Sequence, residues 1–200
     1  MSASNWELRW FFEGSIPQGL IEWLEQQGFK GPKSQNDTYL FLSDGVDLGI
    51  KTSRGEFQVK FRVESREYKS GNGAQTGQME LWVKRVVELK DDNTSIFTGL
   101  KGDPIYVEKE RYQKRYEVKL ENHMVVPVDG RVDVGIMVGI TSIKAKGKDW
   151  WTIGIDGLST DPMEQIDLIE LGGKTVLSPH LDVGFNLENS YSYPKWISIL

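Results

Sequence analysis

The sequence predicts a mainly β fold of the α+β class. We expect one antiparallel sheet of roughly eight strands, closed or nearly closed into a barrel or tunnel, with a few short helices. Short segments of alternating apolar and polar residues follow one another along the chain, separated by turns rich in Gly, Asn, Asp and Ser. In several segments the polar row carries charges of both signs. No internal repeat or linker divides the 200 residues, so a single domain spanning 1–200 is expected.

Segment 106–118 shows the charge pattern most clearly. Side chains of an extended strand alternate between its two faces, so odd and even positions point in opposite directions. Neither face is predicted to be apolar, and a strand of this kind lies at a solvated sheet surface or lines a polar cavity. The odd positions are Lys109, Arg111, Gln113 and Arg115, and the even positions are Glu108, Glu110, Tyr112, Lys114 and Tyr116.

The N-terminal half is predicted to be mostly strands. Segment 5–13 alternates an apolar row, from Trp6 to Phe12, with a largely charged row. A short helix should follow, with Ser15 as its N-cap and Gly28 at its end. Residues 30–37 have the Gly, Pro and polar content of a loop. Further strands are expected at 38–42, 46–52, 56–64 and 79–89.

The C-terminal half should complete the sheet and add a second helix. This helix is expected over 162–171, with Asp161 as its cap and the pair Gly172 and Gly173 closing it. The aromatic tail at 191–197 should dock on the protein, because leaving that much apolar surface in water is unfavourable. Further strands are expected at 124–126, 131–143 and 150–157.

Composition restricts the classes of function. The net charge of −5 argues against a general nucleic-acid binder, which usually carries a basic surface. The absence of cysteine excludes disulfides, thiolate metal sites and a cysteine nucleophile. No apolar run reaches the roughly 20 residues of a membrane span, and the polar start is not typical of a signal peptide. These features favour a soluble, cytoplasmic protein without a membrane partner; the oligomeric state stays open.

Several segments resemble the CYTH superfamily, whose best-known members are the triphosphate tunnel metalloenzymes. The resemblance covers residues 5–156, and the remaining 157–200 are expected to form a C-terminal extension that packs on the barrel. It implies an eight-stranded tunnel that binds a triphosphate. It rests on the order of the elements and on segments 37–40, 48–51, 57–60 and 107–111.

The resemblance is stronger for basic residues than for acidic ones. The opening strand of the family carries Glu-x-Glu-x-Lys, whose carboxylates hold a divalent metal, and the matching residues here are Asn5, Glu7 and Arg9. A late strand of the family carries paired carboxylates, where this chain has Asp156 and a glycine. The basic positions that match are Lys60, Lys109 and Arg111.

A triphosphate-like anion needs cationic donors distributed around an extended chain of phosphates. If the sheet closes, lysines and arginines from separate strands converge on one space. Hydrolysis would further need Mg²⁺ or Mn²⁺, which take oxygen ligands; the candidate ligands are Glu7, Glu80 and Asp156. The predicted ligand-binding residues are Arg9, Lys51, Lys60, Arg62, Lys84, Lys109 and Arg111.

Other interpretations remain open. The barrel could bind a phosphorylated or other anionic small molecule without cutting it, which the incomplete acidic set favours. It could instead bind a small apolar ligand or a protein partner through its aromatic residues. Finally, alternating charge opposite an apolar row is also typical of a half-exposed sheet, in which Lys and Glu of neighbouring strands simply pair.

Overall fold

The computed structural model describes residues 3–43, 45–70, 73–89, 97, 101–177 and 183–200. The helices are α1 (Gln18–Gln26), α2 (Pro162–Val176) and α3 (Tyr193–Ser198), with short 3-10 turns at Leu120–Asn122 and Leu187–Asn189. None of the described helices has the length and apolar character needed to cross a membrane. The strands are β1 (Ala3–Glu13), β2 (Lys30–Phe41), β3 (Leu48–Ser53), β4 (Glu56–Lys69), β5 (Thr76–Glu88), β6 (Asp103–Lys119), β7 (Met124–Val128), β8 (Gly135–Ala145) and β9 (Lys148–Leu158).

Eight of these strands form a closed antiparallel barrel, which confirms the predicted fold class. Neighbouring strands follow the order β2-β3-β4-β5-β1-β9-β8-β6, and pairing between β2 and β6 closes the ring. The ninth strand, β7, pairs with β6 outside the ring. Closure gives each of the eight strands a hydrogen-bonded neighbour on both sides.

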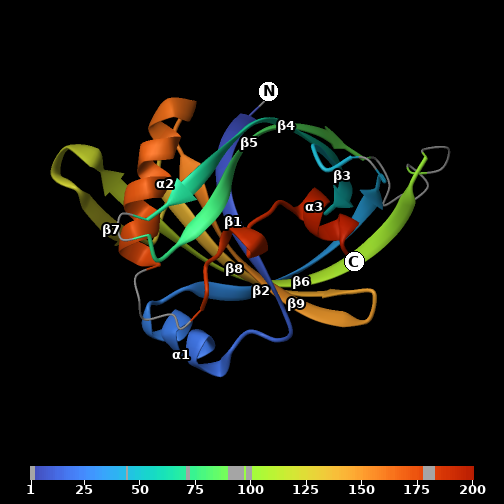
Figure 1. Ribbon diagram of the computed structural model, residues 1–200, viewed down its shortest axis with the longest axis horizontal. Coiled ribbons are helices and arrows are strands. Elements are labelled where there is room, and N and C mark those ends of the chain that lie inside the picture. Colours follow the sequence, from blue (N-terminus) through green and yellow to red (C-terminus); the bar gives the residue numbers. More distant parts are fainter. Residues whose placement is uncertain (1–2, 44, 71–72, 90–96, 98–100, 178–182) are drawn as a thin grey trace.

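The two faces of β1 show how the barrel distributes its apolar residues. Trp6, Leu8 and Trp10 are almost completely buried, and they belong to a core that also contains residues of α1 and α2. This core lies outside the barrel wall, beneath the helices (Figure 1). The intervening positions of β1 point into the barrel and include charged residues. The predicted alternation is therefore present, with its polar row on the inside.

Helix α3 lies within the ring of strands, whereas α2 covers its outside (Figure 1). Trp196 is fully buried, and its ring stacks on that of Phe11 with a centroid distance of 5.3 Å. Together with Ile197 it belongs to a second apolar cluster that fills one end of the barrel. The other buried members of this cluster are Phe11, Tyr39, Ile105, Val107, Ile143 and Ala145.

The prediction of a loop at 30–37 is wrong, because these residues are the first part of β2. Their turn-like composition is overridden by pairing with the long strand β6, from Lys33 opposite Arg111 to Phe41 opposite Asp103. The register shifts between Lys30 and Lys33, so a one-residue bulge interrupts the ladder. The strand predicted at 131–143 was also placed too early, since β8 begins at Gly135.

Two predicted helix ends need correction: the start of α1 and the end of α2. Helix α1 has Pro17 rather than Ser15 at its N-cap position. Helix α2 continues through Gly172 and Gly173, although Asp161 caps its start as expected, by accepting a hydrogen bond from the Met163 amide. A Cβ at Gly172 would lie 2.3 Å from Ile136 Cδ1. The glycine therefore serves close packing of α2 on the barrel rather than termination.

A cation-lined cavity inside the barrel

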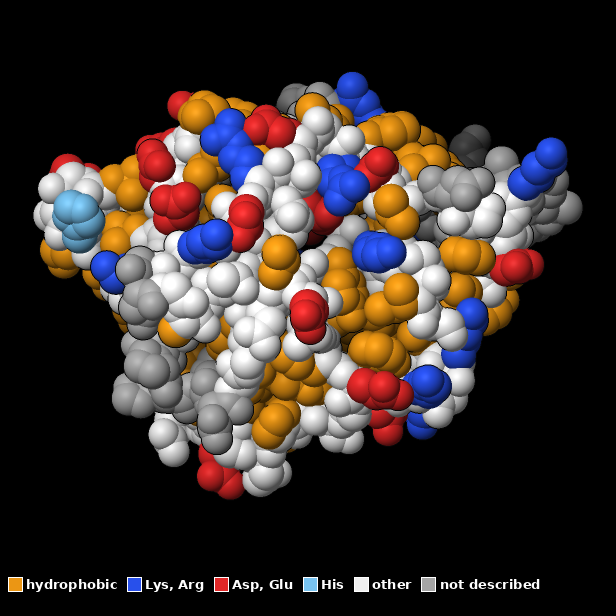
Figure 2. All heavy atoms as spheres, in the orientation of Figure 1, with side chains coloured by type: hydrophobic (Ala, Val, Ile, Leu, Met, Phe, Trp, Pro, Cys, Tyr) orange, Lys and Arg blue, Asp and Glu red, His pale blue; other side chains and the backbone are white. Residues whose placement is uncertain are grey.

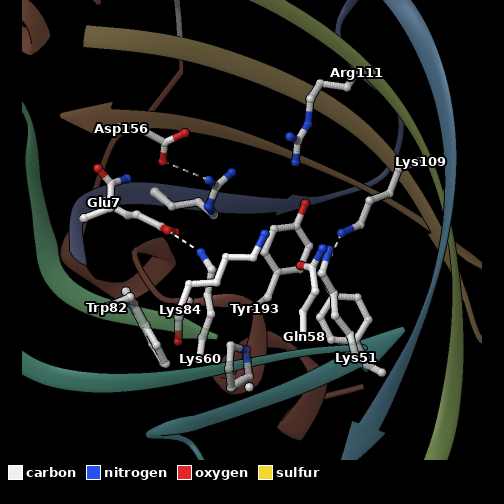
Figure 3. A pocket seen from close by; sticks show the side chains of 16 residues that line it. Glu7, Lys51, Gln58, Lys60, Trp82, Lys84, Lys109, Arg111, Asp156 and Tyr193 are labelled. Carbon is white, nitrogen blue, oxygen red and sulfur yellow. Dashed lines mark hydrogen bonds and ion pairs between the residues drawn. The ribbon is translucent and has the colours of Figure 1, made fainter. Parts of the chain in front are cut away.

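The space left inside the barrel by α3 is a cavity of about 310 Å³. Six lysine or arginine side chains line it, against two carboxylates, so positive charge is in excess (Figure 3). The lining cations come from β1, β3, β4, β5 and β6. The full lining is Asn5, Glu7, Arg9, Tyr39, Gly49, Lys51, Gln58, Lys60, Trp82, Lys84, Lys109, Arg111, Asp156, Ser192, Tyr193 and Pro194.

The structure brings together all the cations predicted for the ligand except one. Arg62 does not line the cavity. Its guanidinium instead donates hydrogen bonds to Glu80 and Asp47. The six that do line it are Arg9, Lys51, Lys60, Lys84, Lys109 and Arg111.

A buried carboxylate holds two of the lysines in place. Asp37 Oδ2 accepts hydrogen bonds from Lys109 Nζ at 2.8 Å and from Lys51 Nζ at 2.9 Å. Lys109 Nζ also donates to the Tyr39 hydroxyl at 2.7 Å and lies 3.7 Å from the ring centroid of Tyr193. The group is deeply enclosed, since Asp37 is 2% exposed and Lys109 is 3% exposed.

This arrangement shifts the pKa values of all three groups. Burial alone would raise the pKa of Asp37, but the charges of Lys109 and Lys51 outweigh it and lower that pKa far below its usual value. Burial lowers the pKa of both lysines to about 7. Their mutual proximity adds to the shift of Lys51, and Arg111 and Arg9 add to that of Lys109. The positive charge on Lys51 and Lys109 therefore decreases as the pH rises through about 7.

Arg9 occupies the space that a side chain at residue 154 would need. A Cβ at Gly154 would lie 2.7 Å from the Arg9 guanidinium carbon. The guanidinium instead lies over this glycine, 3.7 Å from Asp156 Oδ1. The resembling family has a carboxylate at the position of Gly154. In this protein the Arg9 guanidinium fills that space.

The three carboxylates predicted to bind metal lie on neighbouring strands, with Glu7 opposite both Asp156 and Glu80. Each faces a cation: Glu7 accepts from Lys60, Glu80 from Arg62, and Asp156 lies near Arg9. Glu80 also lies outside the cavity lining. Within the described part of the chain, no group of three or more acidic or histidine side chains could hold a metal ion. This arrangement does not fit a Mg²⁺ or Mn²⁺ site, which needs several free oxygen ligands.

The environment also separates the pKa values of these carboxylates. Burial, reinforced by the neighbouring Glu7, raises the pKa of Asp156. Burial likewise raises the pKa of Glu80, although the hydrogen bond from Arg62 opposes the shift. Burial opposes ionisation of Glu7 as well, but Lys60 and Arg9 outweigh it and lower the pKa of Glu7.

Among the described residues, several polar groups of the cavity have no hydrogen-bond partner. Arg111 and Lys84 form no ion pair or hydrogen bond with the described residues. The buried atoms Asp156 Oδ1, Ser192 Oγ and Tyr193 Oη also lack a hydrogen-bond partner. In Figure 3, Arg111, Lys84 and Tyr193 project toward a shared space. Buried polar groups are normally satisfied, so this set indicates room for a polar ligand.

Sequence reasoning missed the part of the site contributed by the C-terminal tail. Ser192, Tyr193 and Pro194 line the cavity at the start of α3. Gly49 allows this approach, since a Cβ there would lie 3.1 Å from Pro194 Cγ. The aromatic content of the tail predicted docking, but no local signal specified the barrel interior as its location.

A closed ring of strands with charged side chains converging inside it defines a β-barrel protein with a polar cavity. Comparisons with solved structures find chains that are similar over most of their length. The PH1819 protein from Pyrococcus horikoshii OT3 is 16% identical over 98% of each chain, with a TM-score of 0.48. A conserved hypothetical protein from Pyrococcus furiosus is 15% identical over 94% of this chain and 98% of that chain, with a TM-score of 0.47.

The mimivirus capping enzyme triphosphatase is also similar, with 9% identity, coverage of 87% of this chain and 89% of that chain, and a TM-score of 0.47. No protein-family model and no curated protein sequence matches the chain.

Proposed function

We propose that this protein binds a linear, triphosphate-like anion inside its barrel. The observation that carries the proposal is the convergence of six cations from five strands on one enclosed space that contains two carboxylates. The protein as a whole has a net charge of −5, and acidic and basic side chains are interspersed on the face shown in Figure 2. Positive charge is thus concentrated where an anion could be surrounded.

An anionic ligand accounts for the cavity better than an apolar one. Displacing water from buried charges without supplying new partners is strongly unfavourable. An apolar ligand would remove water from the half-buried Arg111 and Lys84, which form no ion pair or hydrogen bond with the described residues. Phosphate oxygens would instead accept charge-assisted hydrogen bonds from both side chains.

The cavity residues divide into two kinds of ligand contact. Arg111 and Lys84 are free to bind phosphate oxygens directly, and the Tyr193 hydroxyl can donate a further hydrogen bond. Lys109 and Lys51 supply positive charge while remaining bound to Asp37. The residues that carry the family resemblance, Lys60, Lys109 and Arg111, all line this space.

Binding should not require a divalent metal, because the carboxylates face cations rather than an open coordination position. Inorganic triphosphate titrated into the protein in the presence of a chelator should give saturable binding by calorimetry. A parallel assay with Mg²⁺ or Mn²⁺ should show no release of phosphate above background. Binding that appears only with added metal, or no binding under either condition, would contradict the proposal.

Anion affinity should fall as the pH rises through 7. The pKa of Lys51 and that of Lys109 are both lowered to about 7, and a bound anion favours their charged forms. Affinity for inorganic sulfate should therefore decrease by about tenfold between about pH 6 and about pH 8.5. Sulfate is a suitable probe because its own charge is constant over this range. An affinity independent of pH would show that these lysines do not contribute charge to binding.

A further inference from the structure

A second, smaller hollow lies next to the cavity and is also basic. It has a volume of about 100 Å³ and is lined by four cations and one carboxylate. Its floor is formed by β6, the strand that also contributes Lys109 and Arg111 to the cavity. The complete lining is Gly28, Lys30, Lys33, Gln113, Lys114, Arg115, Val128 and Asp129.

The bulge in β2 places two lysines at this hollow. Lys30 and Lys33 are three positions apart, so in a regular strand they would point to opposite faces. The register shift pairs Lys30 with Gln113 and Lys33 with Arg111. Directly paired residues share a face of the sheet, so both lysines point to the same side as Arg111. A Cβ at Gly31 would lie 2.5 Å from the Arg111 carbonyl oxygen, so the bulge requires glycine at this position.

Register pairing places one residue of the hollow directly beside one residue of the cavity. Lys33, in the hollow, is directly opposite Arg111, in the cavity. Arg115 lies four residues beyond Arg111 on the same face, which corresponds to about 13 Å along an extended strand. Lysines and arginines thus follow one another from the buried Lys109 to the protein surface.

Two of the four cations in the hollow are available for a ligand. Lys30 Nζ lies 3.2 Å from Asp129 Oδ1, and Lys114 donates to the Gln27 carbonyl oxygen. Lys33 and Arg115 are exposed and make no ion pair or hydrogen bond with described residues. The hollow therefore presents two free donors beside a cavity that already concentrates positive charge.

We propose that this hollow is a second anion subsite, which together with the cavity binds a linear polyphosphate longer than triphosphate. This inference rests on the proposed function of the cavity. The lining of the hollow contains no aromatic side chain on which a nucleic-acid base could stack. The observations therefore favour a chain that offers phosphate groups alone over a single-stranded nucleic acid.

The test compares inorganic triphosphate with a medium-chain linear polyphosphate, by calorimetry, on the wild type and on a Lys33→Gln, Arg115→Gln double variant. The double variant should bind polyphosphate about tenfold more weakly and triphosphate within about twofold of the wild type. Its polyphosphate affinity should also depend less steeply on salt, because fewer counterions are released. The matched control is a Lys144→Gln, Lys146→Gln variant, which removes the same charge from the β8–β9 hairpin at the α3 end of the barrel.

The possible outcomes separate the two proposals. Wild-type protein that binds neither anion contradicts the function of the cavity itself. Triphosphate binding with equal polyphosphate affinity in the wild type and the double variant leaves the cavity intact and overturns the second subsite. If the hairpin control weakened polyphosphate binding equally, the effect would come from net charge alone. That result would also overturn the second subsite. A single-stranded oligonucleotide that displaces polyphosphate at lower concentration would overturn the assigned ligand class.

Discussion

Replacing Asp37 with asparagine should lower the free energy of unfolding by about 3 to 5 kcal/mol, because the substitution leaves two buried ammonium groups without their shared counter-ion. Asp37 accepts from both Lys51 and Lys109, and its side chain is inaccessible to solvent. Asparagine keeps the size of the side chain but removes its charge. The loss is measured by urea denaturation of the wild type and the variant.

The destabilisation by Asp37→Asn should be greater at about pH 6 than at about pH 9. At the lower pH both lysines, whose pKa is about 7, carry the charge that the carboxylate compensates. At the higher pH they are largely neutral in the folded protein, so removing the carboxylate matters less. The other titratable or charged groups that interact with this cluster are Tyr39, Arg9, Lys60, Lys84, Arg111 and Tyr193.

The control for Asp37 is Asp133→Asn, which breaks an exposed ion pair with Arg131. Exposed pairs contribute about 0 to 1 kcal/mol, so this variant should unfold nearly like the wild type at both pH values. If Asp37→Asn behaved like Asp133→Asn, the buried cluster would not stabilise the fold.

A double variant, Arg111→Gln with Lys84→Gln, should weaken triphosphate binding by about 3 kcal/mol, or roughly a hundredfold. Each side chain is expected to donate charge-assisted hydrogen bonds to the ligand, and neither has a partner in the described structure that would be lost. The folded protein should therefore keep its stability while its affinity falls. Calorimetry and urea denaturation of the same sample measure both quantities.

The neighbouring Arg85 provides the matched control, because it is exposed and follows Lys84 in β5, where successive side chains point to opposite faces. Arg85→Gln removes one positive charge from the outside of the barrel and so matches the Lys84→Gln half of the double variant; its affinity should stay within about twofold of the wild type. Equal affinity in the double variant and the wild type would mean that the ligand does not enter the cavity.

The alternation of side chains was the strongest guide from sequence to site. It predicted which face of β1 carries Trp6 and Trp10 and which carries Glu7 and Arg9. It also placed Lys109 and Arg111 on one side of β6. The period of two is a local property of an extended chain, so it can be recognised before the partners of a strand are known.

Where the prediction failed, the deciding contacts were distant in the chain. Residues 30–37 form a strand because β6 pairs with them, although their own composition favours a loop. Arg62 lies on the same face of β4 as Lys60, because the two residues are two positions apart. Asp47 and Glu80 nevertheless hold Arg62 outside the cavity lining. Glu80, a predicted metal ligand, accepts a hydrogen bond from Arg62, and this contact between β4 and β5 is not specified by the pattern within either strand.

The interior of the barrel depends on both the local sequence pattern and long-range contacts. The order of residues along each strand was sufficient to assign polar and apolar faces, because the geometry of an extended backbone alternates them without outside help. Whether the polar faces meet depends on β2 pairing with β6, which closes the ring and encloses their charges. The entry of α3 then divides the enclosed space into an apolar end and a cationic cavity, since packing of Trp196 against Phe11 is a contact between opposite ends of the chain.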